Sequence, residues 1–203
     1  MKTFASASCV AVTILAAALL GFGCTTGPME PGRLAATKDR AVWLELVSSV
    51  KVADKIFYVS DSGDVSPVFV SALPLSGELR AAADRRWAED QRFQEQMARW
   101  TGRGRSTVLV GLYARGLNKD ELIKSSRFKL TLRRGAQTAA PEQLELVDRA
   151  WVDDYFPGFN HWEKVLAASF KGELGPQDAL TVEWPSGRRE LALFAPSGPG
   201  AGL

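Results

Sequence analysis

Apolar and polar residues alternate along much of this chain, and the alternation predicts β-strands. In residues 128–133 (FKLTLR) every second side chain is apolar, which is typical of a strand with one buried face and one exposed face. Residues 180–184 and 190–194 repeat this alternation on either side of the turn-forming sequence PSGR at 185–188. These two segments are therefore expected to form a hairpin.

Further short apolar segments are expected to be strands because turn-forming residues separate them: 42–47, 52–59, 65–73, 107–114, 143–147 and 165–170. Many short strands at this spacing favour a mainly β fold, an antiparallel β-sandwich of immunoglobulin- or transthyretin-like architecture. Pro67 lacks the N–H that a strand donates to its neighbour. We therefore expect its strand at the edge of a sheet, where a partner could add a strand.

Residues 78–100 follow a helical period instead. Leu79, Phe93 and Trp100 lie on one apolar stripe, and Ser76 precedes the segment at a position suited to capping a helix. The segment is predicted to be one amphipathic helix inserted into the sandwich. Its apolar stripe is expected to cover an open end or face of the sheets.

The start of the chain has the pattern of an export signal. The apolar run 4–23 follows Met1-Lys2, ends in small residues and precedes Cys24. A positive start, an apolar core and small residues before a cleavage point are features of a secretory signal peptide. With cysteine at the cleavage point, the segment resembles a bacterial lipoprotein signal. The resemblance implies that residues 1–23 are removed and that Cys24 becomes a lipidated N-terminus, which anchors the chain to a membrane.

This segment differs from the usual lipoprotein signal at Gly21, where leucine is common. Gly21 and Gly23 also fit the small-x-small rule of ordinary signal peptidase, which would release a soluble periplasmic or secreted protein beginning at Cys24. The run also approaches the roughly 20 residues of a membrane-spanning helix, so an uncleaved anchor is a third possibility. Each alternative places the remainder of the chain outside the cytoplasm.

Composition divides the rest of the chain into three parts. Residues 24–39 and 195–203 are rich in glycine, proline and small residues, which is typical of a flexible tether and a disordered tail. Residues 40–194 have the length of one domain. The only cysteines are Cys9 and Cys24, so this domain must depend on its core rather than on disulfide bonds.

Charge and histidine content exclude several kinds of partner. Once Lys2 is removed, 25 basic residues become 24 against 23 acidic ones, a net charge of +1 that does not indicate nucleic acid. His161 is the only histidine, which excludes a histidine-rich metal site. No metal and no cofactor are expected.

The sequence does not indicate catalysis. It contains no G-x-S-x-G elbow and no phosphate-binding glycine loop, and any Ser-His-Asp triad would have to use His161. Ser48 and Lys51 match the S-x-x-K motif of penicillin-recognising enzymes, but that motif needs a helical turn and this region is expected to be strand. Asp61 and Asp64 are interpreted as turn residues rather than as calcium ligands.

The best candidate for a binding site is the segment YFPGFNHW at 155–162, whose Pro-Gly pair indicates a loop or a sharp corner. Exposed rings here would form a platform for a sugar, a peptidoglycan fragment or a partner protein, with hydrogen bonds from the polar members. Alternatively, the rings plug the end of the sandwich, with at most Tyr155 and Trp162 reaching solvent. The candidate binding residues are Tyr155, Phe156, Phe159, Asn160, His161 and Trp162.

Three classes of function are compatible with these features. The first is a non-catalytic cell-envelope lipoprotein, a protein-interaction or scaffold domain held at the membrane, with another envelope protein as its partner. The second is a sandwich that binds a glycan, peptidoglycan or a small ligand through residues 155–162, and the third is an enzyme built on His161. In its signal and general architecture the chain resembles β-rich lipoproteins of Gram-negative envelopes. Thr25 after Cys24 favours the outer membrane, facing the periplasm.

Overall fold

The structure is a computed structural model that describes residues 39–59, 65–102, 104–114, 128–184 and 187–194. The predicted signal peptide, the predicted lipidation site Cys24, nearly all of the predicted tether and the predicted tail lie outside the described residues, and so do Asp61 and Asp64.

Nine strands form two antiparallel sheets in the described part of the chain. The five-stranded sheet has the order β1-β2-β3-β7-β6, and the four-stranded sheet has the order β5-β4-β8-β9. The strands are β1 Val52–Val59, β2 Val65–Leu75, β3 Arg105–Ala114, β4 Lys129–Arg134, β5 Gln137–Ala139, β6 Gln143–Leu146, β7 Lys164–Lys171, β8 Ala179–Trp184 and β9 Gly187–Ala192. The predicted mainly β sandwich and its β8–β9 hairpin are confirmed.

The two sheets pack face to face through alternate side chains. In β2 the inward residues Val68, Val70 and Ala72 are at most 1% exposed, and they share a buried cluster with Leu132 and Leu180 of the opposite sheet. Because side chains alternate between the two faces of a strand, the residues between them point to the outer face of the five-stranded sheet. That sheet therefore faces two different cores.

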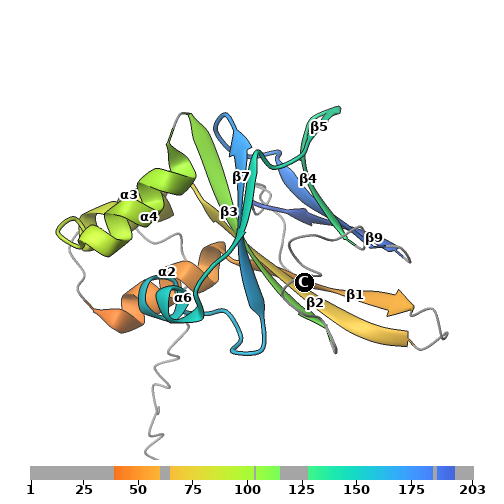
Figure 1. The fold of residues 1–203 in the computed structure, drawn as a ribbon, viewed down its shortest axis with the longest axis horizontal. Helices are drawn as coiled ribbons and strands as arrows, with labels where there is room; N and C mark the ends of the chain where they lie inside the picture. Colours follow the sequence, from red (N-terminus) through yellow and green to blue (C-terminus); the bar gives the residue numbers. More distant parts are fainter. Residues whose placement is uncertain (1–38, 60–64, 103, 115–127, 185–186, 195–203) are drawn as a thin grey trace, which may run out of the picture.

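Four helices cover part of this outer face and give three layers in the order helices, sheet, sheet (Figure 1). They are α2 Arg40–Val50, α3 Gly77–Arg86, α4 Gln91–Thr101 and α6 Arg149–Tyr155. The helices gather over one half of the sheet, and the far ends of β1 and β2 extend beyond them (Figure 1).

The predicted strand at 42–47 is wrong, because these residues lie in α2. Asp39 caps this helix by accepting a hydrogen bond from the backbone N–H of Ala41 at 2.8 Å. Trp43, Leu46 and Val47 are buried at a spacing of three and four residues, which places them on one helical face. A nearly continuous apolar run is compatible with either a buried strand or a helix. Here the cap at Asp39 and the buried helical face favour the helix.

The single helix predicted at 78–100 is also wrong, since the structure divides it into α3 and α4. The backbone of Trp87 leaves the helical conformation, with φ −117° and ψ 35°. Asp90 then caps α4 by accepting a hydrogen bond from the N–H of Phe93 at 3.0 Å. Ser76 stands at the start of α3 as expected, but its side chain makes no capping hydrogen bond.

The expected edge position of the strand containing Pro67 is wrong as well, because β2 lies between β1 and β3. Pro67 pairs in register with Phe57 of β1, and the pairing of β2 with β3 begins one residue later, at Val68. Within the described residues, Pro67 is paired on its β1 side only, and a strand tolerates a residue without an N–H where no neighbour needs that donor.

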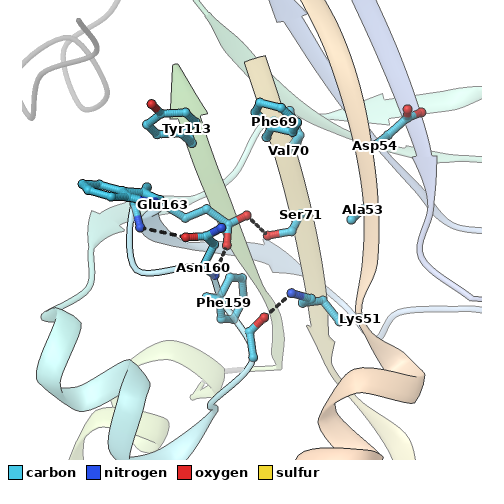
Figure 2. A pocket seen from close by; sticks show the side chains of 12 residues that line it. Lys51, Ala53, Asp54, Phe69, Val70, Ser71, Tyr113, Phe159, Asn160 and Glu163 are labelled. Atoms are coloured by element: carbon cyan, nitrogen blue, oxygen red, sulfur yellow. Dashed lines mark hydrogen bonds between the residues drawn. The ribbon is translucent and has the colours of Figure 1, made fainter. Parts of the chain in front are cut away.

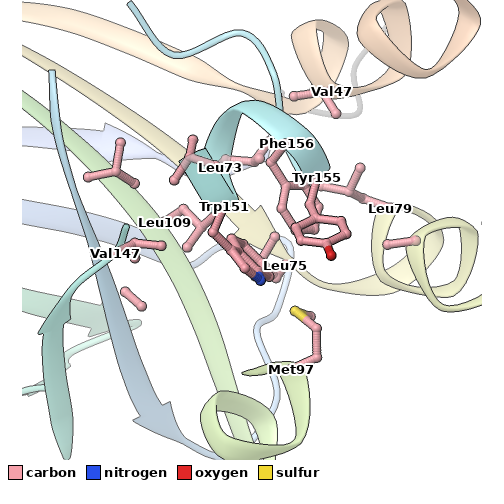
Figure 3. Close-up of a cluster of buried hydrophobic side chains, with 14 of the residues drawn as sticks. Val47, Leu73, Leu75, Leu79, Met97, Leu109, Val147, Trp151, Tyr155 and Phe156 are labelled. Carbon is pink, nitrogen blue, oxygen red and sulfur yellow. The ribbon is translucent and has the colours of Figure 1, made fainter. Parts of the chain in front are cut away.

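A cluster of aromatic rings holds the helices against the sheet (Figure 3). Phe156 is fully buried, and its ring lies 5.7 Å from that of Trp151, 5.8 Å from Trp43 and 6.2 Å from Trp87 and Phe93, measured between centroids. Ring pairs at these separations stabilise a core beyond the burial of their area. The cluster thus joins all four helices.

We expect Phe156→Ala to lower the free energy of unfolding by about 3–5 kcal/mol, because it removes a buried ring from the centre of this cluster. Trp162→Ala, six residues along the same segment, removes a side chain that is 62% exposed and should change stability by no more than about 0.5 kcal/mol. Urea denaturation of both variants measures the difference. Equal losses would contradict the division of this segment into a buried half and an exposed half.

Candidate functional site

A cleft of about 500 Å³ lies on the outer face of the five-stranded sheet, beside the area that the helices cover (Figure 2). Leu73 and Leu109 on this face are fully buried under the helices, whereas Phe69, four residues before Leu73 in β2, is 42% exposed. The cleft is lined by Lys51, Ala53, Asp54, Phe69, Val70, Ser71, Tyr113, Gly158, Phe159, Asn160, Trp162 and Glu163. It therefore forms between the sheet and the loop that follows α6.

The backbone of this loop is held by two cationic side chains. The Lys51 ammonium donates to the carbonyl of Gly158 and lies 5.3 Å from the centre of the Phe159 ring. The Arg149 guanidinium donates to the carbonyls of Asn160 and Phe159 at 2.8 and 3.0 Å. With Phe159 itself only 5% exposed, the loop is fastened to the body of the domain at several points.

Glu163 connects the end of the loop to the sheet. Its carboxylate accepts a hydrogen bond from the Ser71 hydroxyl at 2.6 Å and another from the backbone N–H of Asn160, and its side chain is directed toward β2 in Figure 2. Glu163 is 8% exposed and Ser71 is 2% exposed, so this contact is buried at the base of the cleft.

Gly111 of β3 makes room for this arrangement. A Cβ on Gly111 would lie 2.7 Å from Cδ1 of Phe159 and 3.0 Å from the carboxyl carbon of Glu163, and closer still to the Ser71 hydroxyl. Real side chains do not approach so closely, so the loop can reach the sheet here because this strand position has no side chain.

Aromatic side chains border the open part of the cleft. Trp162 is 62% exposed and packs against the imidazole of His161, with 4.1 Å between ring centroids. Phe69 and the half-buried Tyr113 lie side by side on neighbouring strands, with 6.1 Å between their ring centroids. The Asn160 amide oxygen accepts from the N–H of Trp162 at 3.2 Å, which orients the Asn160 side chain on the loop.

Charged groups of both signs lie around these rings. The Lys55 ammonium lies 5.6 Å from the centre of the Phe69 ring. Asp54 accepts from the Arg189 guanidinium of β9 at 2.5 Å, and this hydrogen bond is the main reason that the pKa of Asp54 lies below its ordinary value. The cleft therefore offers hydrogen-bond donors and acceptors together with apolar faces.

The six candidate binding residues separate into two groups. Tyr155, Phe156 and Phe159 are at most 5% exposed and belong to the core under the helices, as in the interpretation with buried rings; of Tyr155 and Trp162, only Trp162 reaches solvent. Burial is the main cause that raises the pKa of Tyr155 to about 12, and its hydrogen bond to Asp90 adds to the effect.

The second group, Asn160, His161 and Trp162, is exposed. Asn160 and Trp162 line the cleft, and so does one edge of the buried Phe159. Sequence reasoning missed Phe69, Tyr113 and Glu163, which lie on the same cleft. The sequence places Phe69 and Tyr113 in predicted strands, but only the pairing of β2 with β3 brings them to one face.

The Ser48–Lys51 motif lies at the end of α2 rather than in the expected strand, but the S-D-N and K-T-G motifs that accompany it in penicillin-recognising enzymes are absent from the sequence. The structure gives Lys51 another role, because its ammonium binds the Gly158 carbonyl and stabilises the loop. Ser48 is exposed on the surface of the helix. Within the described residues, no group of three or more His, Cys, Asp or Glu side chains is arranged to hold a metal ion.

The chain matches no protein-family model, and no curated protein or solved structure shows significant similarity to it. In the part of the chain that the structure describes, no helix is both long enough and apolar enough to cross a membrane.

Gly111→Ala is expected to lower the free energy of unfolding by about 1–3 kcal/mol, because the added methyl group overpacks the contact between Ser71 and Glu163. Gly175→Ala is the matched control, since its Cβ would meet only Asp178 Oδ1 at 3.8 Å. The control should change stability by less than about 0.5 kcal/mol. Thermal and urea unfolding compare the two variants, and similar effects would show that the close packing at Gly111 is not a constraint.

Proposed function

We propose that this chain is a non-catalytic ligand-binding domain of the cell envelope, which holds a glycan or another small polar ligand in the cleft beside β2 and the loop 156–163. The observation that carries the proposal is that Trp162 and Phe69, both large and apolar, remain exposed at a concave site. Other large apolar side chains on this face whose burial the structure describes, such as Leu73 and Leu109, are covered by helices.

The size and shape of the cleft favour a small ligand. Sites for small molecules usually enclose about 300–1,000 Å³ and combine apolar walls with a few polar groups. The cleft of about 500 Å³ is within this range, and Asn160, Lys51 and Glu163 supply polar groups around its rings. A sugar suits such a site because its ring has apolar C–H faces and its edge carries hydroxyl groups that both donate and accept hydrogen bonds.

A scaffold that binds another envelope protein is the second candidate. Leu44 on α2 is 42% exposed, and its Cδ1 lies 3.9 Å from the position of a Cβ on Gly158. The exposed apolar surface therefore continues from the loop onto the helix. This extension favours a protein contact, while the concavity beside it favours a ligand.

The location of the domain is part of the proposal. The apolar run 4–23 before Cys24 supports export and lipidation, and residues 25–38 would separate the anchored cysteine from Asp39 at the start of α2. A lipid-anchored domain at the outer membrane would present the cleft to the periplasm.

For the anchor, we expect that mass spectrometry of the protein from its native membranes finds no residues 1–23 and a diacylglycerol on Cys24. Cys24→Ser should prevent this modification and release the protein from the membrane fraction, because a serine hydroxyl cannot replace the modified thiol. A cytosolic product with an intact Met1, or a soluble product with an unmodified Cys24, would contradict the anchor.

For the ligand, we expect the domain to bind β-1,4-linked tetrasaccharides, tested by isothermal titration calorimetry with tetramers of glucose, N-acetylglucosamine and glucosamine. Trp162→Ala should weaken binding of the best tetramer at least tenfold, or about 1.4 kcal/mol, because it removes the exposed ring of the site. Lys129→Ala, an exposed change on β4 of the other sheet, should leave binding unchanged.

Two results would count against this function. Binding that is equal in wild type and Trp162→Ala would place the saccharide elsewhere. Absence of binding by all three tetramers, together with recovery of an envelope protein by wild type but not by Trp162→Ala, would favour the scaffold function instead.

A further inference from the structure

Glu163 is the least solvated carboxylate of the cleft, and it has no charged partner among the described residues. It is 8% exposed, it lines the cleft, and its hydrogen bonds come from the hydroxyl of Ser71 and the backbone N–H of Asn160. Both donors are neutral. Among the described residues, no lysine, arginine or histidine forms an ion pair with Glu163.

A carboxylate in this environment has both unbalanced charge and unused hydrogen-bonding capacity. Each of its oxygens can accept about two hydrogen bonds, and each accepts one here. A buried carboxylate is stable when a cation compensates its charge, and an uncompensated one is strongly unfavourable. The missing partner can come from a ligand in the cleft.

The two lysine ammonium groups near the cleft already contact groups other than Glu163. The Lys51 ammonium is bound to the Gly158 carbonyl and the Phe159 ring, and the Lys55 ammonium lies over the Phe69 ring. Both lysines are on the β1 side of the cleft. Their positive charges disfavour a second cation on that side. A ligand cation is therefore expected on the other side of the cleft, which the loop and β3 form.

On that side, Tyr113 and Trp162 line the same cleft as Glu163, and among the described side chains no cation lies over either ring. The faces of aromatic rings carry partial negative charge and attract ammonium groups within about 6 Å. A carboxylate beside two such rings is an arrangement that suits the binding of an ammonium group.

We propose that Glu163 anchors a protonated amino group of the ligand, so that the preferred ligand is a sugar that carries a free amine. The proposal rests on the function proposed above and names the ligand class. The ammonium donates to the free positions of the Glu163 carboxylate, while the C–H face of the sugar ring lies against Trp162 or Tyr113. The hydroxyl groups reach Asn160 and Lys51 at the edge of the cleft.

The three tetramers test this proposal because they differ only at one substituent, which is a hydroxyl, an acetamide or an ammonium group. At pH 6, wild type is expected to bind the glucosamine tetramer at least tenfold more tightly than either neutral tetramer. Glu163→Gln keeps the shape of the side chain and an acceptor for Ser71, but it removes the charge. It should reduce this preference to less than twofold.

Each outcome decides the matter. A wild type that binds a neutral tetramer as tightly as the amine would overturn the proposal and leave the ligand-binding function in place. A Glu163→Gln variant that still prefers the glucosamine tetramer would likewise overturn the proposal and leave the ligand-binding function in place. No binding by any tetramer would overturn both. If Glu163→Gln does not fold, as judged by circular dichroism, the wild-type comparison still decides, because it requires no variant.

Discussion

The packing of aromatic rings between the helices and the outer face of the five-stranded sheet determines the rest of this structure. Trp43 of α2 donates its indole N–H to the carbonyl of Tyr155 at 2.8 Å, which ties α2 to the end of α6. Phe156, the next residue, is in the centre of the cluster. Because the described residues contain no cysteine, the domain depends on its core rather than on disulfide bonds, and this contact has to be maintained.

The same packing explains why a cleft exists. The rings hold the helices over one half of the sheet, and no described helix lies over the other half of that face (Figure 1). The chain leaves the core at Phe156 and returns to the sheet at Glu163, and Gly111 provides the space for that return. One short segment therefore both completes the core and forms the wall of a site.

Sequence patterns predicted most strands because period-two alternation is a local signal. The pattern failed at 42–47, where a nearly continuous apolar run packs as α2, and at Asp90, whose cap divides one predicted helix into two. Strand order is not local, so the internal position of the strand with Pro67 could not be obtained from that residue alone.

The site was predicted in part for the same reason. A compact aromatic segment is visible in the sequence, and Asn160 and Trp162 do line the cleft. Phe69 and Tyr113 join them only through the pairing of β2 with β3, which brings residues 44 positions apart to the same register. Glu163 carries no signal until its burial against Ser71 is known.

The central claim is that the uncovered part of this sheet face is a binding surface. Nuclear magnetic resonance of the labelled domain, titrated with the glucosamine tetramer, tests it most directly. The account predicts that amide shifts concentrate at Ser71, Gly111 and Asn160 and at the indole of Trp162, with the four-stranded sheet unaffected. Shifts centred on β4 and β8, or no shifts at millimolar saccharide, would contradict it.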